Sequence, residues 1–234
     1  MPLGFGFDPT MLLLLPAMGF ALWAQFKVKS TYEKFAQVPA SSGVTGREMA
    51  RAIMQRNGVS DVEVEPIGGT LSDHYDPGAL RVRLSEGIYD GRSISAIAVA
   101  AHEVGHVLQH QQRWFPMQLR AQVVPVANLG STLAMPLFFI GFLFGPRMPF
   151  GGMLMDLGIL FFAAAVLFHV VTLPVEFDAS KRALAQLTSS GAVMPQEVAG
   201  AKKVLDAAAL TYVAAASMAA LQLIRLVLLR DSRR

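Results

Sequence analysis

The sequence contains no cysteine, and only 16% of its 234 residues are charged, whereas 53% are hydrophobic. Without cysteine there can be no disulfide and no thiolate metal site, so any metal must be bound by histidine and carboxylate. Soluble domains have about a quarter of their residues charged, so much of this surface is not expected to face water. The net charge of +3, with basic residues spread along the chain, argues against a nucleic-acid partner.

The apolar residues gather in four segments. About 20 apolar residues cross the hydrocarbon core of a bilayer as a helix. The first segment is short, holds Pro16 and has its basic residues after it, which favours a retained anchor over a cleaved signal peptide. The fourth is alanine-rich and contains Arg225, so it either spans or packs at the interface. We predict a mainly α multi-pass protein of the cell membrane with three to four transmembrane helices, as one domain over residues 1–234. The segments are about 10–26, 123–144, 153–174 and 207–229.

The basic residues are unevenly distributed between the polar regions. Fifteen of the twenty Lys and Arg residues fall in regions 27–120 and 175–206, which share one side of the membrane if there are four crossings. Loops rich in Lys and Arg remain in the cytoplasm. We therefore expect both regions, and any site that they form, on the cytoplasmic side.

Local patterns predict several elements in these regions. Thr45 and Glu48 form a capping-box pattern at the start of a helix that Gly58 would end. The runs 62–65 and 80–84 alternate with period two around a Gly-, Asp- and Pro-rich connection, which predicts a small antiparallel β-sheet. Ser93 is placed to cap a long, apolar helix that follows it.

That helix carries the strongest chemical pattern. His102 and His106 are four residues apart and so lie on one helix face, where both imidazoles can reach one tetrahedral ion. Glu103 is rotated about 100° from His102 around the helix, beside the metal rather than on it, as a general base must be. The alternative is a buried histidine pair held by core hydrogen bonds, but burying these groups without a metal is costly.

A catalytic zinc site needs a third protein ligand. His110 lies on the same stripe but one step too far along the helix, which leaves the acidic residues. Glu176 follows Pro174 at the polar end of the third apolar segment, on the same side as the histidines, and there it opens a further expected helix. A glutamate favoured by the dipole at a helix start is the alternative interpretation.

Five parts of the chain carry a shared pattern: 71–77, 83–85, 100–106 with Gln109, 173–180 and 211–213. Together they resemble the YugP-like membrane zinc metallopeptidases and, more distantly, the HtpX-type gluzincin membrane proteases. This resemblance implies a zincin-like HExxH core, Zn²⁺ bound by His102, His106 and Glu176, a membrane location and peptide-bond hydrolysis. Gluzincins place an aspartate four residues after the ligand glutamate, where this chain has Ser180. Asp178, Ser180 or an acid of loop 72–76 are therefore candidates to orient the ligands.

These observations predict a zinc-dependent endopeptidase that acts on a membrane-associated protein or peptide. Glu103 would take a proton from the attacking water, and His74 or Tyr75 would stabilise the oxyanion, although their loop could equally be a hydrogen-bonded turn. The alternative function is a catalytically silent, zinc-containing membrane scaffold or chaperone. Glu103 favours the enzyme, because a scaffold has no need of a glutamate beside two ligands. Hydrolysis of a non-peptide amide remains open.

Overall fold

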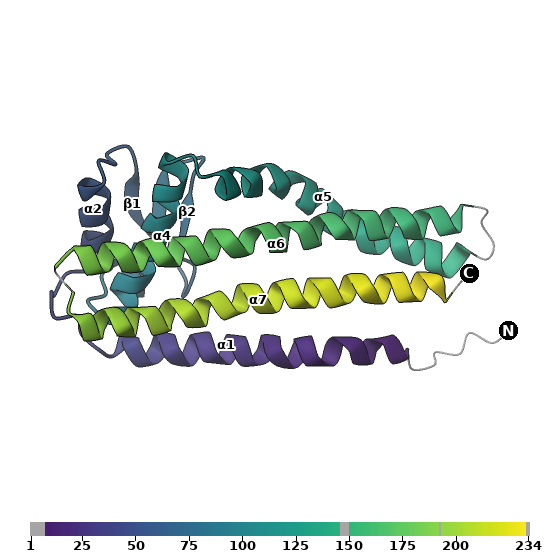
Figure 1. Ribbon diagram of the computed structural model, residues 1–234, viewed down its shortest axis with the longest axis horizontal. Coiled ribbons are helices and arrows are strands. Elements are labelled where there is room, and N and C mark those ends of the chain that lie inside the picture. Colours follow the sequence, from purple (N-terminus) through teal and green to yellow (C-terminus); the bar gives the residue numbers. More distant parts are fainter. Residues whose placement is uncertain (1–7, 146–149, 192, 233–234) are drawn as a thin grey trace. The chain divides into compact units, whose positions relative to one another are not determined.

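The computed structural model describes residues 8–145, 150–191 and 193–232 (Figure 1). Helices dominate, and a small sheet lies between the first two long helical stretches of the chain. In chain order the elements are η1 (Pro9–Leu14), α1 (Leu15–Ala36), α2 (Gly46–Arg56), β1 (Glu63–Ile67), β2 (His74–Asp76), β3 (Arg81–Ser85), α3 (Glu86–Tyr89), α4 (Ile94–Gln111), α5 (Phe115–Phe144), α6 (Gly151–Ser189) and α7 (Pro195–Asp231).

Four helical stretches among the described residues are long and apolar enough to cross a membrane: Pro9–Ala36, Phe115–Phe144, Gly151–Ser189 and Pro195–Asp231. Each contains one of the four predicted apolar segments. Large apolar side chains on them point outward, for example Phe26 with 71% of its surface exposed. Such exposure suits contact with lipid rather than water.

One predicted boundary is wrong. The third apolar helix was expected to end at about Pro174 and another helix to open at Glu176, but α6 continues through Pro174 without a break. Proline removes one backbone hydrogen bond and tends to kink a helix. In long apolar helices this loss is tolerated, because neighbouring groups satisfy the freed carbonyl. Glu176 is therefore an interior residue of α6, not a helix-start glutamate.

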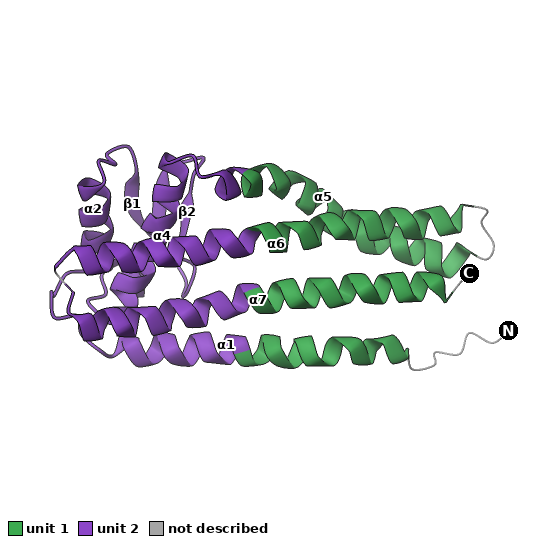
Figure 2. Cartoon of the chain, viewed as in Figure 1, with its two compact units in different colours: residues 1–23, 119–171, 213–234 green, residues 24–118, 172–212 purple. Residues whose placement is uncertain are grey.

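The contacts divide the chain into two compact units (Figure 2). Unit 1 comprises Met1–Trp23, Leu119–Val171 and Val213–Arg234, and unit 2 comprises Ala24–Gln118 and Thr172–Tyr212. The sequence predicts a single domain over residues 1–234. The two units alternate along the chain, so each consists of segments that the other unit separates in the sequence. The single domain stays our prediction.

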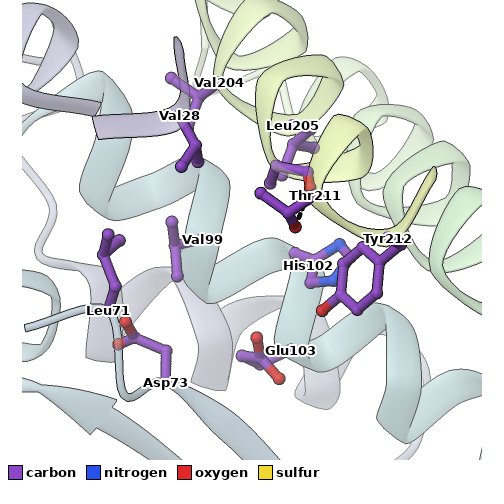
Figure 3. A pocket seen from close by; sticks show the side chains of 11 residues that line it. Val28, Leu71, Asp73, Val99, His102, Glu103, Val204, Leu205, Thr211 and Tyr212 are labelled. Atoms are coloured by element: carbon purple, nitrogen blue, oxygen red, sulfur yellow. Dashed lines mark hydrogen bonds between the residues drawn. The ribbon is translucent and has the colours of Figure 1, made fainter. Parts of the chain in front are cut away.

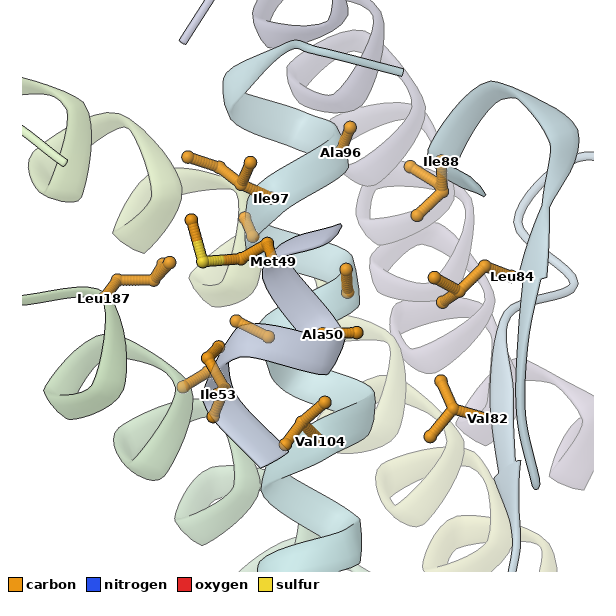
Figure 4. Close-up of a cluster of buried hydrophobic side chains, with 14 of the residues drawn as sticks. Met49, Ala50, Ile53, Val82, Leu84, Ile88, Ala96, Ile97, Val104 and Leu187 are labelled. Atoms are coloured by element: carbon orange, nitrogen blue, oxygen red, sulfur yellow. The ribbon is translucent and has the colours of Figure 1, made fainter. Parts of the chain in front are cut away.

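Unit 2 has a continuous hydrophobic core in which α2 and the sheet pack against α4 (Figure 4). Ile53, Leu84 and Ile97 are fully buried there. The predicted caps are confirmed: Thr45 and Glu48 form a reciprocal capping box, and Ser93 accepts a hydrogen bond from the backbone of Ala96. Local capping therefore defines where α2 and α4 begin.

The prediction of a purely antiparallel sheet is wrong. The strands lie in the order β1-β3-β2, with β1 parallel to β3 and only β2 antiparallel to it. A parallel pair needs a crossover connection of about a dozen residues, and the segment between β1 and β3 provides it. That segment itself contributes β2, which turns back tightly into β3.

Unit 1 contains the ionisable side chains that the sequence places in apolar segments. Arg225 of α7 donates a hydrogen bond to Asp8 at 2.7 Å, and Arg230 pairs with Asp156 of α6 at 2.7 Å. A charge within an apolar helix is normally paired or faces a protein interior. Pairing therefore reduces the cost of Arg225 in the fourth apolar segment.

Candidate metal centre and active-site pocket

The candidate metal centre forms where α4 and α6 approach each other closely. A β-carbon added to Gly105 would lie 2.5 Å from the carbonyl oxygen of Ala179, a distance that real atoms do not tolerate. Only glycine therefore permits this backbone approach. Because Gly105 lies between the two histidines and Ala179 lies one turn after Glu176, the approach brings the carboxylate to the imidazoles.

Three predicted ligands converge at this point. Oε2 of Glu176 lies 3.3 Å from Nε2 of His102 and 3.5 Å from Nε2 of His106. Two ligands of a tetrahedral zinc ion, each about 2.05 Å from the metal, are about 3.3 Å apart. His106 and Glu176 are buried and His102 nearly so. Among the described residues these three are the cluster whose ligand atoms, all within 4.8 Å of one another, could hold a metal ion.

Hydrogen bonds determine which nitrogen of His106 faces the carboxylate. Nε2 of Gln109 donates to the carbonyl of Val175 at 2.8 Å and to Asp178 at 2.9 Å, both of which only accept. The remaining amide oxygen of Gln109 lies 3.0 Å from Nδ1 of His106, so Nδ1 must carry the proton. Nε2 then presents a lone pair to Glu176. Two facing acceptors at 3.5 Å require a cation or a proton between them, and the donor set fits zinc.

The groups that orient the ligands also differ from the gluzincin pattern. Ser180 lies 3.1 Å from Nδ1 of His102 and so contacts a candidate ligand directly. Asp178 acts on His106 only through Gln109. In the loop, Asp73 accepts from the backbone and hydroxyl of Ser85. Three candidates were predicted to orient the ligands: Asp178, Ser180 and an acid of the loop. Ser180 contacts a histidine directly and Asp178 contacts one through Gln109, whereas Asp73 of the loop bonds to Ser85.

A pocket of about 270 Å³ opens beside the centre (Figure 3). His102 and Glu103 of α4 line it together with the acidic side chain of Asp73, while α1, α7 and the loop before β2 supply mainly apolar side chains. The full lining is Val28, Leu71, Asp73, Val99, His102, Glu103, Val204, Leu205, Ala208, Thr211 and Tyr212.

Glu103 is the most perturbed acid of this pocket. Burial raises the pKa of Glu103 to about 7, and the positive potential of His102 and a backbone hydrogen bond from Tyr75 oppose this rise, whereas the charges of Glu176 and Asp73 add to it. Burial also raises the pKa of Asp73, against the hydrogen bonds from Ser85. A carboxyl group with a pKa near neutrality, in a pocket next to a candidate metal ligand, is suited to proton transfer.

Comparison with known proteins agrees with this geometry. The family described as "Putative neutral zinc metallopeptidase" matches residues 10–231. The chain is also 52% identical over 217 residues to the "Putative membrane protease YugP" of Bacillus subtilis (strain 168), a match that covers 93% of this chain and 94% of that protein. The chain belongs to the YugP-like zinc metallopeptidase family. No solved structure matches it.

Membership of the YugP-like family extends over nearly the whole chain, including the four apolar helices. The chain is thus a multi-pass membrane protein of a zinc peptidase family. The family implies zinc as the metal, and the cluster of His102, His106 and Glu176 is the place in the described structure that could hold it.

The two predicted oxyanion donors of this YugP-like protein lie outside the lining of the pocket. The hydroxyl of Tyr75 lies 2.8 Å from Nδ1 of His110, and burial raises the pKa of Tyr75 to about 12. Nδ1 of His74 donates to the carbonyl of Ser72 at 2.8 Å. Tyr75 meets Glu103 through its backbone instead. Oxyanion stabilisation by either side chain stays a prediction.

Other site residues were not recognised by their chemistry in the sequence. Gln109 appeared only as part of the family resemblance, yet its position three residues after His106 puts both on one helix face, a signal that could have revealed the contact. Tyr212 and Leu205 of α7 line the pocket; Tyr212 appeared only within the matching segment 211–213, and Leu205 carries no local pattern. More than 90 residues separate them from His102 in the sequence, so only packing brings them together.

Proposed function

We propose that this chain is a membrane-bound, zinc-dependent endopeptidase of the gluzincin type, with His102, His106 and Glu176 as metal ligands and Glu103 as general base. The observation that carries the proposal is the placement of Glu103: a buried carboxyl group, with a pKa raised to about 7, lines the same pocket as His102. A general base is most effective when its pKa is close to the working pH.

Each side chain has a defined part in the proposed reaction. When bound, zinc supplies Lewis-acid polarisation of the scissile carbonyl and makes a water molecule more acidic. Glu103 takes the proton of the attacking water and transfers it to the leaving amine. Gln109 keeps Nδ1 of His106 protonated, so that its Nε2 stays available as a ligand.

The pocket suggests which substrates fit. Its lining beside His102 and Glu103 is mostly aliphatic, from Val28, Val99, Leu205 and their neighbours. Burial of an apolar side chain of the substrate in such a pocket is favourable, whereas a charged side chain would lose its hydration there. We propose a membrane-associated protein or peptide as substrate, cleaved next to an apolar residue.

A pair of variants tests the proposal. Glu103→Gln keeps the size of the side chain but removes the base, so it should bind zinc as the wild type does and cleave at least about a hundredfold more slowly. His102→Ala removes a ligand and should lose both zinc and activity. Zinc is measured by elemental analysis of purified protein, and cleavage on a mixed-sequence peptide library by mass spectrometry, which also reports preference for apolar residues at the cut.

One result would contradict the mechanism and another the proposed function. Wild-type turnover by zinc-loaded Glu103→Gln would exclude Glu103 as the base. Full cellular function of a Glu103→Gln protein that cleaves nothing would instead favour the zinc-containing scaffold or chaperone.

A further inference from the structure

A second pocket, of about 420 Å³, lies between α1 and α7 and shares no lining residue with the active-site pocket. Its size is within the range of small-molecule sites. Three lysines and one aspartate border it, with a threonine and apolar side chains between them. The lining is Lys27, Thr31, Lys34, Phe35, Lys203, Asp206, Ala207 and Leu210.

The charge in this pocket is positive and uncompensated. Among the described residues, Lys27, Lys34 and Lys203 have no carboxylate within ion-pair distance, although Lys29 pairs with Glu33 and Lys202 with Asp206. Asp206 is the one acidic residue that borders the pocket, and its ion pair with Lys202 at 2.6 Å neutralises its charge. Three lysines line one cavity, so their ammonium groups repel each other, and an anion between them would relieve this repulsion.

The position of the pocket along both helices defines its depth. Lys27 directly follows the apolar segment 10–26, and Ala207 and Leu210 open the apolar segment 207–229. The pocket therefore lies where the polar part of each helix meets its apolar part. In a membrane helix this boundary lies at the level of the lipid headgroups, where lysine ammonium groups meet phosphate.

We propose that this pocket binds the phosphate headgroup of an anionic phospholipid. Lys27, Lys34 and Lys203 contact the phosphate, the hydroxyl of Thr31 supplies a further donor, and Leu210, at the start of the apolar part of α7, packs against the glycerol and the first part of the acyl chains. Lysine suits this ligand as a point charge with three donors. A zwitterionic lipid carries a compensating ammonium, so three lysines select against it.

The test uses the full chain in detergent with equal amounts of dioleoylphosphatidylglycerol and dioleoylphosphatidylcholine, and native mass spectrometry measures the bound lipid. The pocket variant is Lys27→Gln/Lys34→Gln/Lys203→Gln. The matched control, Lys29→Gln/Arg51→Gln/Lys181→Gln, removes the same charge from side chains outside the pocket and leaves the pair of Lys202 with Asp206 intact. Each pocket lysine should contribute about fivefold to the affinity, so the pocket variant should bind phosphatidylglycerol at least tenfold more weakly, while the control keeps wild-type binding. Lys34 is exposed, so Lys34→Gln alone should fold as the wild type does and show an intermediate loss of lipid binding.

Three outcomes would overturn the proposal. Equal phosphatidylglycerol binding by the pocket variant and the wild type would show that the lysines do not form the site. Equal losses in the pocket variant and the control would show a nonspecific effect of net charge. The third outcome is that millimolar inorganic phosphate stabilises the protein against thermal unfolding and that phosphatidylglycerol adds no further stabilisation. This result would assign the pocket to free phosphate rather than lipid.

Discussion

The amide oxygen of Gln109 lies 3.0 Å from Nδ1 of His106, while the amide nitrogen of the same side chain donates to Asp178 on α6. One glutamine thus joins the helix of the histidines to the helix of the candidate third ligand. It also selects the tautomer of His106 in which Nε2 is free to bind a metal.

The first prediction follows from this contact. Gln109→Leu keeps a similar volume but removes the acceptor, so His106 loses its preferred tautomer and the zinc affinity should fall about 10- to 100-fold. Competition with a chelator of known affinity measures the loss. Gln111→Leu is the control, because Gln111 is on the same helix but bonds to Asp61. Equal zinc affinity of the Gln109→Leu variant and the control would contradict the role of Gln109.

The second prediction concerns the ionisation of Glu103 in metal-free protein. The folded state raises the pKa of Glu103 from an ordinary value of 4.5 to about 7, so folding favours the protonated form. Ionisation therefore costs stability as the pH rises from about 4.5 to 7, by up to about 3 kcal/mol. Glu103→Gln does not ionise, and its stability relative to the wild type should grow over this window and level off above it.

Thermal unfolding in chelator across this pH range measures the effect. The exposed Glu86 of α3 provides the control Glu86→Gln, whose difference from the wild type should change little. A difference between Glu103→Gln and wild type that does not depend on pH would show that the buried Glu103 keeps its charge.

The third prediction tests the close approach of α4 and α6. Gly105→Ala places a methyl group 2.5 Å from the Ala179 carbonyl, so the helices must separate, at a cost of typically about 1–3 kcal/mol. Separation would also move Glu176 away from the histidines and weaken zinc binding. Gly19→Ala in α1 meets nothing within 4 Å and should be neutral or slightly stabilising. Unchanged stability and zinc affinity of Gly105→Ala would contradict this packing argument.

The fourth prediction concerns topology. The native chain has no cysteine, so single cysteines report their own positions. Ser60→Cys and Ser189→Cys lie in the two lysine- and arginine-rich regions and should be protected from an impermeant thiol reagent in intact cells. Phe150→Cys, between the second and third apolar segments, should be labelled. Opposite labelling of Ser60→Cys and Ser189→Cys would place the two polar regions on different sides and contradict the shared metal site.

The sequence by itself determined the features that depend on near neighbours in the chain. The capping box of α2, the cap of α4 and the four apolar segments follow from side chains within a few turns of one another. Helical geometry alone also places His102 and His106 on the same face of α4. For the same reason the peptidase family was recognisable from short motifs.

Only the tertiary structure decided the features that join distant parts of the chain. The parallel pairing of β1 with β3 depends on the path of their connection, because alternation alone does not encode strand direction. The bond from Gln109 to the carbonyl of Val175 spans 66 positions, and the pocket beside Glu103 draws side chains from α1 and α7. Such contacts arise when whole elements pack, and close packing depends on the fit of surfaces that no local pattern specifies.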